Sequence, residues 1–281
     1  MQLALDCIPC FINQVIRLSE RIGFDEDTTR NLMNTAWDVM KNSPPEITPP
    51  EVALQVYQTV FSYTDIEDPL IDLKSECTDM ALALYPGLKE LVRHADDPLR
   101  MALQLAVAGN VIDFGQASTF DIQAEIDKVL AAEFPIFDYD SFVRAQDKTD
   151  MVLYIADNAG ESVFDRILIE EMKKPVVYAV RSEPVQNDVV YEDALQAGID
   201  KVATVLSSGA PTPGAVVKLC SPEFLDLYDS AGMVISKGQG NYEALSDETR
   251  PIFFLLKVKC RHFSHVVGVP EGSYVVQLRN G

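Results

Sequence analysis

Asp157 and Asn158 directly follow an uninterrupted apolar run at residues 151–156. Such a run predicts a strand buried on both faces, and the helical spacing of the apolar residues behind it predicts a covering helix. In open parallel sheets, ligands bind outside the carboxyl ends of the strands, and carboxylate and amide oxygens suit a divalent cation. The two side chains therefore predict a metal site, while a turn with a helix cap would use the same residue types.

A second carboxylate follows the next apolar run along the chain. Residues 176–180 form that run, and Asp188 lies in the polar loop behind it. Because neighbouring parallel strands end at the same edge of a sheet, Asp188 is within loop reach of Asp157. We expect both carboxylates to bind one cation, although an isolated acid in a loop is more often a cap or a solvated charge.

Two later apolar runs end in residues suited to an anion. Ser208 and Gly209 follow one run, and small residues there allow backbone amides to approach an anion closely. Lys237 and Gly238 follow the other, on a glycine-rich turn that leads into a predicted helix. Each feature is weak alone, since a lone lysine is usually a surface charge. Beside a bound cation, these groups could hold and polarise a phosphoryl group.

The elements that must position these residues change in character along the chain. The first part has the apolar spacing of helices, including one expected at about residues 68–85 and ended by Pro86 and Gly87. We assign residues 1–95 to a helical bundle and 96–281 to an α/β domain, with 114–150 fitting either part. Repeated βα units on a largely parallel sheet are predicted by apolar runs at 152–156, 176–180, 202–206, 233–236 and 252–256.

Composition limits the class of protein. The chain has 281 residues, 47% of them hydrophobic, which is enough for a full core. Its formal net charge of -20 repels nucleic-acid phosphates and anionic lipid, so neither nucleic acid nor a membrane is an expected partner. No apolar stretch approaches the roughly 20 residues that cross a bilayer, and the N-terminus lacks the pattern of a signal peptide. We therefore expect a cytoplasmic protein.

Cysteines and histidines offer a weaker signal. Cys7 and Cys10 form a Cys-x-x-Cys pair, which could be half of a zinc site, a redox pair, or two packed thiols beside a helix start. No second close pair of cysteines accompanies it. For His94, His262 and His265 we expect structural or surface roles, because no third ligand lies nearby in sequence.

The ordered combination of these motifs resembles the DUF89 family of metal-dependent damage-control phosphatases, in its short microbial and archaeal branch with an N-terminal cysteine pair. The resemblance spans nearly the whole chain. It is carried by Cys7-x-x-Cys10, Gly109-Asn110-x-x-Asp113, Asp157-Asn158-Ala159-Gly160-Glu161, Asn187-Asp188 and Lys237-Gly238-x-Gly240-Asn241-Tyr242-Glu243.

The resemblance implies a fold, an activity and a set of site residues. The implied fold is a helical bundle on an α/β domain with a Rossmann-like, mostly parallel sheet. The implied activity is hydrolysis of small phosphometabolites with Mn²⁺, Co²⁺, Ni²⁺ or Mg²⁺, held by Asp157, Asn158 and Asp188. From the mechanism, rather than from the resemblance, we expect Asp113 or Glu161 to orient the attacking water. Substrate-binding residues would be Asn110, Glu161, Ser208, Gly209, Lys237, Gly238 and Asn241.

Two other functions remain open from the sequence. One is an S-adenosylmethionine-dependent carboxyl methyltransferase, an activity claimed for a relative in the family, although the turn at residues 157–161 has one glycine where such cofactor loops usually have two or three. The other is a non-catalytic protein that binds metal and phosphate. A covalent aspartyl-phosphate route would need an Asp-x-Asp motif, and Ala159 stands at the second position. The substrate among phosphate esters and the oligomeric state stay open.

Overall fold

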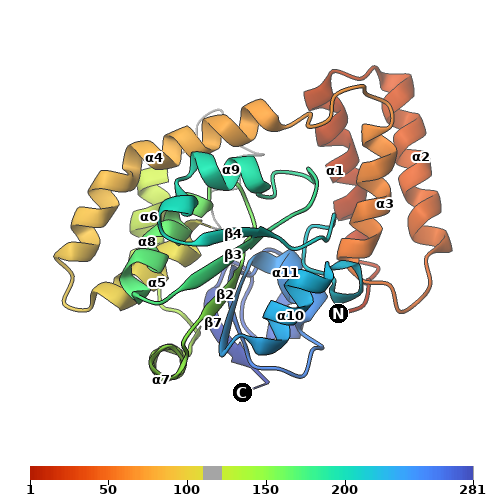
Figure 1. Ribbon diagram of the computed structural model, residues 1–281. Coiled ribbons are helices and arrows are strands. Elements are labelled where there is room, and N and C mark those ends of the chain that lie inside the picture. Colours follow the sequence, from red (N-terminus) through yellow and green to blue (C-terminus); the bar gives the residue numbers. More distant parts are fainter. Residues whose placement is uncertain (110–121, 281) are drawn as a thin grey trace.

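The apolar runs of the second half form a seven-stranded sheet in the computed structural model, which describes residues 1–109 and 122–280 (Figure 1). The strand order is β1-β7-β6-β5-β2-β3-β4, and the described neighbours are parallel except for the antiparallel pair β6 and β7. The predicted α/β class is therefore confirmed. The strands are β1 (Ile136–Phe137), β2 (Val152–Ile155), β3 (Val176–Val180), β4 (Thr204–Ser207), β5 (Met233–Lys237), β6 (Ile252–Lys257) and β7 (Tyr274–Arg279).

Helices cover both faces of the sheet. Along β2, Val152 and Tyr154 face one apolar core and Leu153 and Ile155 face the other, and all four are fully buried. This double burial explains why the strand reads as a continuous apolar run. The first core is covered by α4 (Ile71–Arg93), α5 (Pro98–Gly109), α6 (Ile122–Ala131), α7 (Tyr139–Lys148), α8 (Ser162–Met172) and α9 (Tyr191–Gln196). The second is covered by α10 (Pro222–Ser230), α11 (Gly238–Leu245) and α12 (Arg261–Val267).

The first three helices form a bundle with an apolar core of its own, at one side of the sheet (Figure 1). They are α1 (Cys7–Ile22), α2 (Glu26–Asn42) and α3 (Pro49–Phe61). Val185, from the loop after β3, is buried in the same core. The bundle is thereby joined to the loops at the carboxyl edge of the sheet.

Helix α4 differs from its predicted length and packing. We expected it to end before Pro86, and instead it continues through Pro86 and Gly87 to Arg93. Leu88 and Val92 in its last turns are buried in the core that covers the sheet. Burial of these side chains offsets the missing proline N–H, which is a case of tertiary packing overriding a local signal. The helix before the predicted boundary at residue 95 thus packs on the α/β part.

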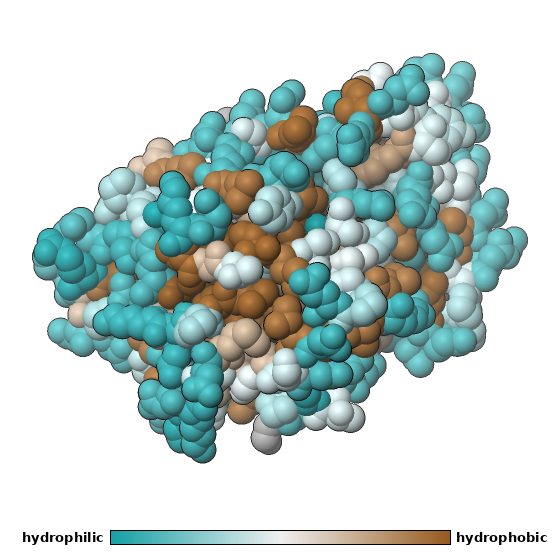
Figure 2. All heavy atoms as spheres, viewed as in Figure 1, coloured by the Kyte–Doolittle hydropathy of each residue, from teal (hydrophilic) through white to brown (hydrophobic). Residues whose placement is uncertain are grey.

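The surface is largely hydrophilic in the view of Figure 2, with apolar residues gathered near its middle. That region corresponds to the part of the molecule where β3, β4 and α9 lie in Figure 1. No helix in the described ranges is long and apolar enough to span a bilayer.

Candidate active site at the carboxyl edge of the sheet

Several of the predicted site residues lie where the order of the strands reverses. Strand β2 has β3 on one side and β5 on the other, so the chain leaves β2 in one direction and returns on its opposite side. Asp157 follows β2, and Gly238 follows β5. A crevice at such a switch point is the usual ligand site of an open parallel sheet.

Backbone pairing brings the three predicted metal ligands together. Asn158 and Asp188 form an isolated antiparallel bridge, and the Val189 N–H donates to the carbonyl oxygen of Asp157 at 2.8 Å. The loops after β2 and β3 are therefore held side by side. Both carboxylates also face one cation: Arg181 donates from Nε to Asp188 Oδ2 at 2.7 Å, and its Nη2 lies 3.8 Å from Asp157 Oδ1. The predicted proximity of Asp157 and Asp188 is found in the structure.

The side chain of Asn158 is oriented by its neighbours. Its Nδ2 donates to Asp157 Oδ2 at 3.1 Å and to Glu161 Oε2 at 3.2 Å. Both amide hydrogens are thus occupied, while Oδ1 receives no hydrogen bond from the residues that the structure describes. Since Oδ1 is the atom that ligates a metal, this arrangement is suitable for coordination.

Burial disfavours the ionised forms of Asp157 and Asp188. It raises the pKa of Asp157 well above its ordinary value, with further contributions from the charges of Asp188 and Glu161. Burial also raises the pKa of Asp188, to about 6, against the opposing charge and hydrogen bond of Arg181. A cation between the two carboxylates would remove this penalty.

Lys237 is turned into the interior. Its side chain is fully buried, and its ammonium group donates to Glu161, to Asp165 Oδ1 at 2.5 Å and to the Ala106 carbonyl at 2.9 Å. Burial lowers the pKa of Lys237, but the charges of Asp165 and Glu161 outweigh it and hold that pKa above its ordinary value. All three N–H groups are therefore used inside the protein in this structure. The expected contact of Lys237 with a phosphate stays a prediction.

Asn241 and the turn after β4 have partners inside the protein, and their expected substrate contacts stay predictions. The buried amide of Asn241 donates to the carbonyls of Ala156 and Lys237 and accepts from the Ala215 N–H, so it joins three loops. The amides of Ser208 and Gly209 donate within the protein, to Val180 O at 2.7 Å and Ser207 Oγ at 3.2 Å. The structure thus shows these groups holding loops together.

Gly238 does sit in the site, and its lack of a side chain is required there. Its φ is +76°, and an added Cβ would lie 1.8 Å from Asp157 Oδ2. Gly238 also begins α11, so the positive end of that helix faces the Asp157 carboxylate. Two other predicted site residues, Asn110 and Asp113, lie outside the described residues.

Two charged residues at this edge were missed by sequence reasoning. Arg181 directly follows β3, and Lys259 follows β6 by two residues. The positive charge of Lys259, which is exposed, lowers the pKa of Asp157 and of Asp188. A charged residue immediately after a buried run was the available signal in both cases.

The buried groups of the site fit a divalent cation in number and kind. Four carboxyl groups and two basic side chains in this cluster are at most 8% exposed, which gives a formal excess of two negative charges when all of them are ionised. No three His, Cys, Asp or Glu side chains that could hold a metal ion converge in the described ranges. The predicted donor set of two carboxylates and one amide stays a prediction. The cluster consists of Asp157, Glu161, Asp165, Asp188, Arg181 and Lys237.

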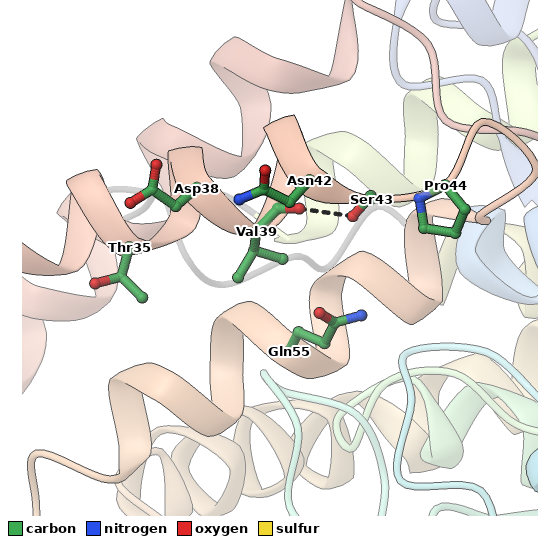
Figure 3. A pocket seen from close by; sticks show the side chains of 7 residues that line it. All are labelled: Thr35, Asp38, Val39, Asn42, Ser43, Pro44 and Gln55. Atoms are coloured by element: carbon green, nitrogen blue, oxygen red, sulfur yellow. Dashed lines mark hydrogen bonds between the residues drawn. The ribbon is translucent and has the colours of Figure 1, made fainter.

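Pockets elsewhere do not contain the predicted residues. One, of about 330 Å³, lies between α2 and α3 and is lined by Asp38 with neutral side chains (Figure 3). A second, of about 460 Å³, lies between α3 and the loops after β3 and β4. Its lining comprises Leu54, Tyr57, Gln58, Phe61, Ile66, Glu67, Glu183, Pro184, Val185 and Pro211.

Cys7 and Cys10 begin α1 as free thiols. Burial raises the pKa of Cys7 to about 11 and that of Cys10 in the same direction. This burial disfavours the thiolate that redox chemistry or zinc binding requires, and the role of the pair stays a prediction.

Comparison with known protein families identifies the family of this chain. Residues 3–275 match the family model described as the damage-control phosphatase ARMT1-like domain. The chain belongs to this family. A crystal structure of a DUF89 family protein from Pyrococcus horikoshii superposes with a TM-score of 0.88 at 32% identity, covering 100% of both chains. The resemblance to DUF89 proteins that the motifs carried is confirmed.

Relatives of this damage-control phosphatase family are similar over their full length. A protein named damage-control phosphatase from Pyrococcus horikoshii is 33% identical over 100% of this chain and 99% of its own. One with the same name from Archaeoglobus fulgidus is 27% identical over 99% of each. An uncharacterized protein from Methanocaldococcus jannaschii is 34% identical over 98% of this chain and 94% of its own.

Proposed function

We propose that the protein is a metal-dependent phosphatase that hydrolyses small phosphorylated metabolites. The observation that carries this proposal is the convergence of Asp157, Asn158 and Asp188 at the switch point of the sheet. Membership of the damage-control phosphatase family and relatives with that name support the reaction class. As metals we propose Mn²⁺, Co²⁺, Ni²⁺ or Mg²⁺, because all three donors are oxygens.

Each residue of the site has a separate proposed role. A divalent cation held by Asp157, Asn158 and Asp188 would supply neutralisation of phosphate charge and a water of lowered pKa. Glu161 is fully buried between Asn158 and Lys237, so we assign it to orienting the Asn158 amide. Lys237 compensates the charge of Glu161 and Asp165, which keeps that support in place. For Asp113, orientation of the attacking water stays our proposal.

The organic part of the substrate has a candidate location beside α3. The pocket of about 460 Å³ shares Glu183, Pro184 and Val185 with the loop that carries Asp188. Its lining includes two carboxylates and no basic side chain among the described residues. We therefore infer a preference for phosphate esters whose organic part is neutral, such as hydroxyl-rich sugars, over those with a second anionic group.

Asp157→Ala tests the function. Release of inorganic phosphate from a panel of phosphate monoesters is measured with each metal and with a chelator. We expect metal-stimulated release by the wild type and a drop of about 100-fold or more in the variant, because one anionic ligand is lost. Asp38→Ala is the control: Asp38 lines the pocket of Figure 3, away from the carboxyl edge, and the change should leave turnover intact.

The rival functions give different results in the same assay. A non-catalytic binding protein would bind Mn²⁺ without releasing phosphate from any ester. A carboxyl methyltransferase would transfer a methyl group from S-adenosylmethionine and show no metal-stimulated phosphate release. Equal turnover by wild type and Asp157→Ala would also contradict the proposed site.

A further inference from the structure

Arg181 has unused hydrogen-bonding capacity at the centre of the site. It follows β3 directly, and its backbone N–H pairs with the Val189 carbonyl at 2.9 Å, which fixes the base of its side chain beside the metal-ligand loops. Only 1% of the residue is exposed. Its Nε donates to Asp188, while Nη1 and Nη2 have no hydrogen-bond partner in the described chain.

The nearest carboxylate does not satisfy these nitrogens. Asp157 Oδ1 lies 3.8 Å from Nη2, which is an ion-pair distance but too long for a hydrogen bond. Leaving a buried donor unpaired costs free energy, and the cost is larger for a charged group than for a neutral one. A protein keeps such donors most readily where a ligand completes them.

The chemistry of the guanidinium group points to a phosphate. Its terminal nitrogens form a planar fork that matches two oxygens of a tetrahedral anion. Lys237, the other buried cation of the cluster, has its three N–H groups occupied by Glu161, Asp165 and Ala106. Among the buried cations of this cluster, Arg181 is therefore the one with donors for an anion.

We propose that Arg181 binds the phosphate of the substrate through Nη1 and Nη2 while its Nε holds Asp188 in position. The inference rests on the proposed phosphatase function and names the residue that binds the phosphate at the same site. Asp157, Asn158 and Asp188 would hold the cation beside Arg181.

Arg181→Lys tests this assignment because it keeps the charge and removes the fork. Binding of inorganic phosphate to the Mn²⁺-loaded protein is measured by calorimetry, and binding of Mn²⁺ alone by electron paramagnetic resonance. We expect phosphate affinity to fall at least 10-fold, Mn²⁺ affinity to change less than 3-fold, and KM to rise more than kcat falls. A loss of Mn²⁺ affinity with unchanged phosphate affinity would show that Arg181 serves Asp188 alone and would overturn the proposal.

Arg250→Lys is the matched control. Arg250 is half-buried and also has unpartnered guanidinium nitrogens, but it precedes β6 and thus lies at the opposite edge of the sheet. Its replacement should leave phosphate affinity unchanged. If Arg181→Lys does not fold, a crystal structure of the wild type with Mn²⁺ and tungstate, a phosphate analogue, decides. Tungstate oxygens within hydrogen-bond distance of Nη1 and Nη2 support the proposal, and an anion bound without Arg181 overturns it.

Failure of this inference can be told from failure of the function. If the wild type turns over substrate and Arg181→Lys has unchanged KM and phosphate affinity, Arg181 does not bind the phosphate. The phosphatase function then still holds. Absence of wild-type turnover removes the phosphatase, and the phosphate-binding measurements still test Arg181.

Discussion

Buried charges at the carboxyl edge are arranged in two groups with different tasks. Lys237 lies between Glu161 and Asp165, at ion-pair distance from both, and this group is internally balanced by hydrogen bonds as well as charge. Asp157 and Asp188 share Arg181 and retain raised pKa values from burial. The first group supports the site, and the second is the one that gains from a bound cation.

Glu243 supplies a prediction about pH and stability. Burial raises its pKa from 4.5 to about 7, so the folded state favours the protonated acid. Folding stability from this group is present below pH 4.5 and is lost as pH rises through about 7. Glu243→Gln should therefore raise the free energy of unfolding at pH 8 by up to about 3 kcal/mol, and by much less at pH 4.5, measured by urea denaturation.

The matched control for Glu243 is Glu20→Gln on the exposed side of α1. We expect that change to stay within about 0.5 kcal/mol at both pH values. An equal effect of Glu243→Gln at pH 4.5 and pH 8 would contradict the assigned protonation of Glu243 in the folded state.

Helix α11 positions the site through its first residue. Gly238 has the left-handed φ of +76° and brings the start of the helix against the Asp157 carboxylate. Asn241, one turn later, connects the helix to the ends of β2 and β5 through the carbonyls of Ala156 and Lys237. The glycine-rich turn was predicted to cradle a phosphate, and the structure shows Gly238 of this turn packed against Asp157.

Gly238→Ala should therefore damage metal binding. The added Cβ would overlap Asp157 Oδ2, at 1.8 Å, and force the carboxylate away. We expect Mn²⁺ affinity to fall by about 10–100-fold, as for other changes that displace a metal ligand, measured by electron paramagnetic resonance. Gly268→Ala separates backbone strain from this clash, because Gly268 has a φ of +83° and nothing within 4 Å of its added Cβ. Equal loss of Mn²⁺ affinity in both variants would contradict the overlap with Asp157 as the cause.

At the scale of the whole molecule, the helical bundle is coupled to the site through the loop that carries Asp188. Val185 is buried in the core of α1–α3, and its carbonyl accepts the Asp188 N–H at 3.0 Å. Lys218, beyond β4, forms an ion pair with Glu51 of α3 at 2.5 Å. The bundle thus packs against the loops that carry the predicted ligands.

Val185→Ala should affect both stability and metal binding. Loss of its buried methyl groups is expected to cost about 2 kcal/mol of unfolding free energy. Mn²⁺ affinity should also fall, since Val185 anchors the loop of Asp188. Val56→Ala, in the same core but on α3, should cost similar stability and leave Mn²⁺ affinity unchanged. Denaturation and metal titration of both variants measure this, and unchanged metal affinity in Val185→Ala would argue against the coupling.

The sequence by itself determined the α/β class, the strands β2 to β6 and the convergence of Asp157, Asn158 and Asp188. These follow from local signals, because a strand buried on both faces reads as an apolar run and parallel strands end at one edge. The sequence did not predict β1 or β7. Strand β1 has only two residues, and β7 pairs antiparallel with β6.

Only the tertiary structure decided where the charged side chains point. Lys237 faces Glu161 and Asp165 at the start of α8, and Arg181 faces Asp188, although both basic residues lie at the carboxyl ends of strands. Likewise α4 continues past Pro86 because its last turns are buried against the core. These side-chain directions and this helix length depend on contacts between segments far apart in the chain. Residue spacing along the sequence does not predict such contacts.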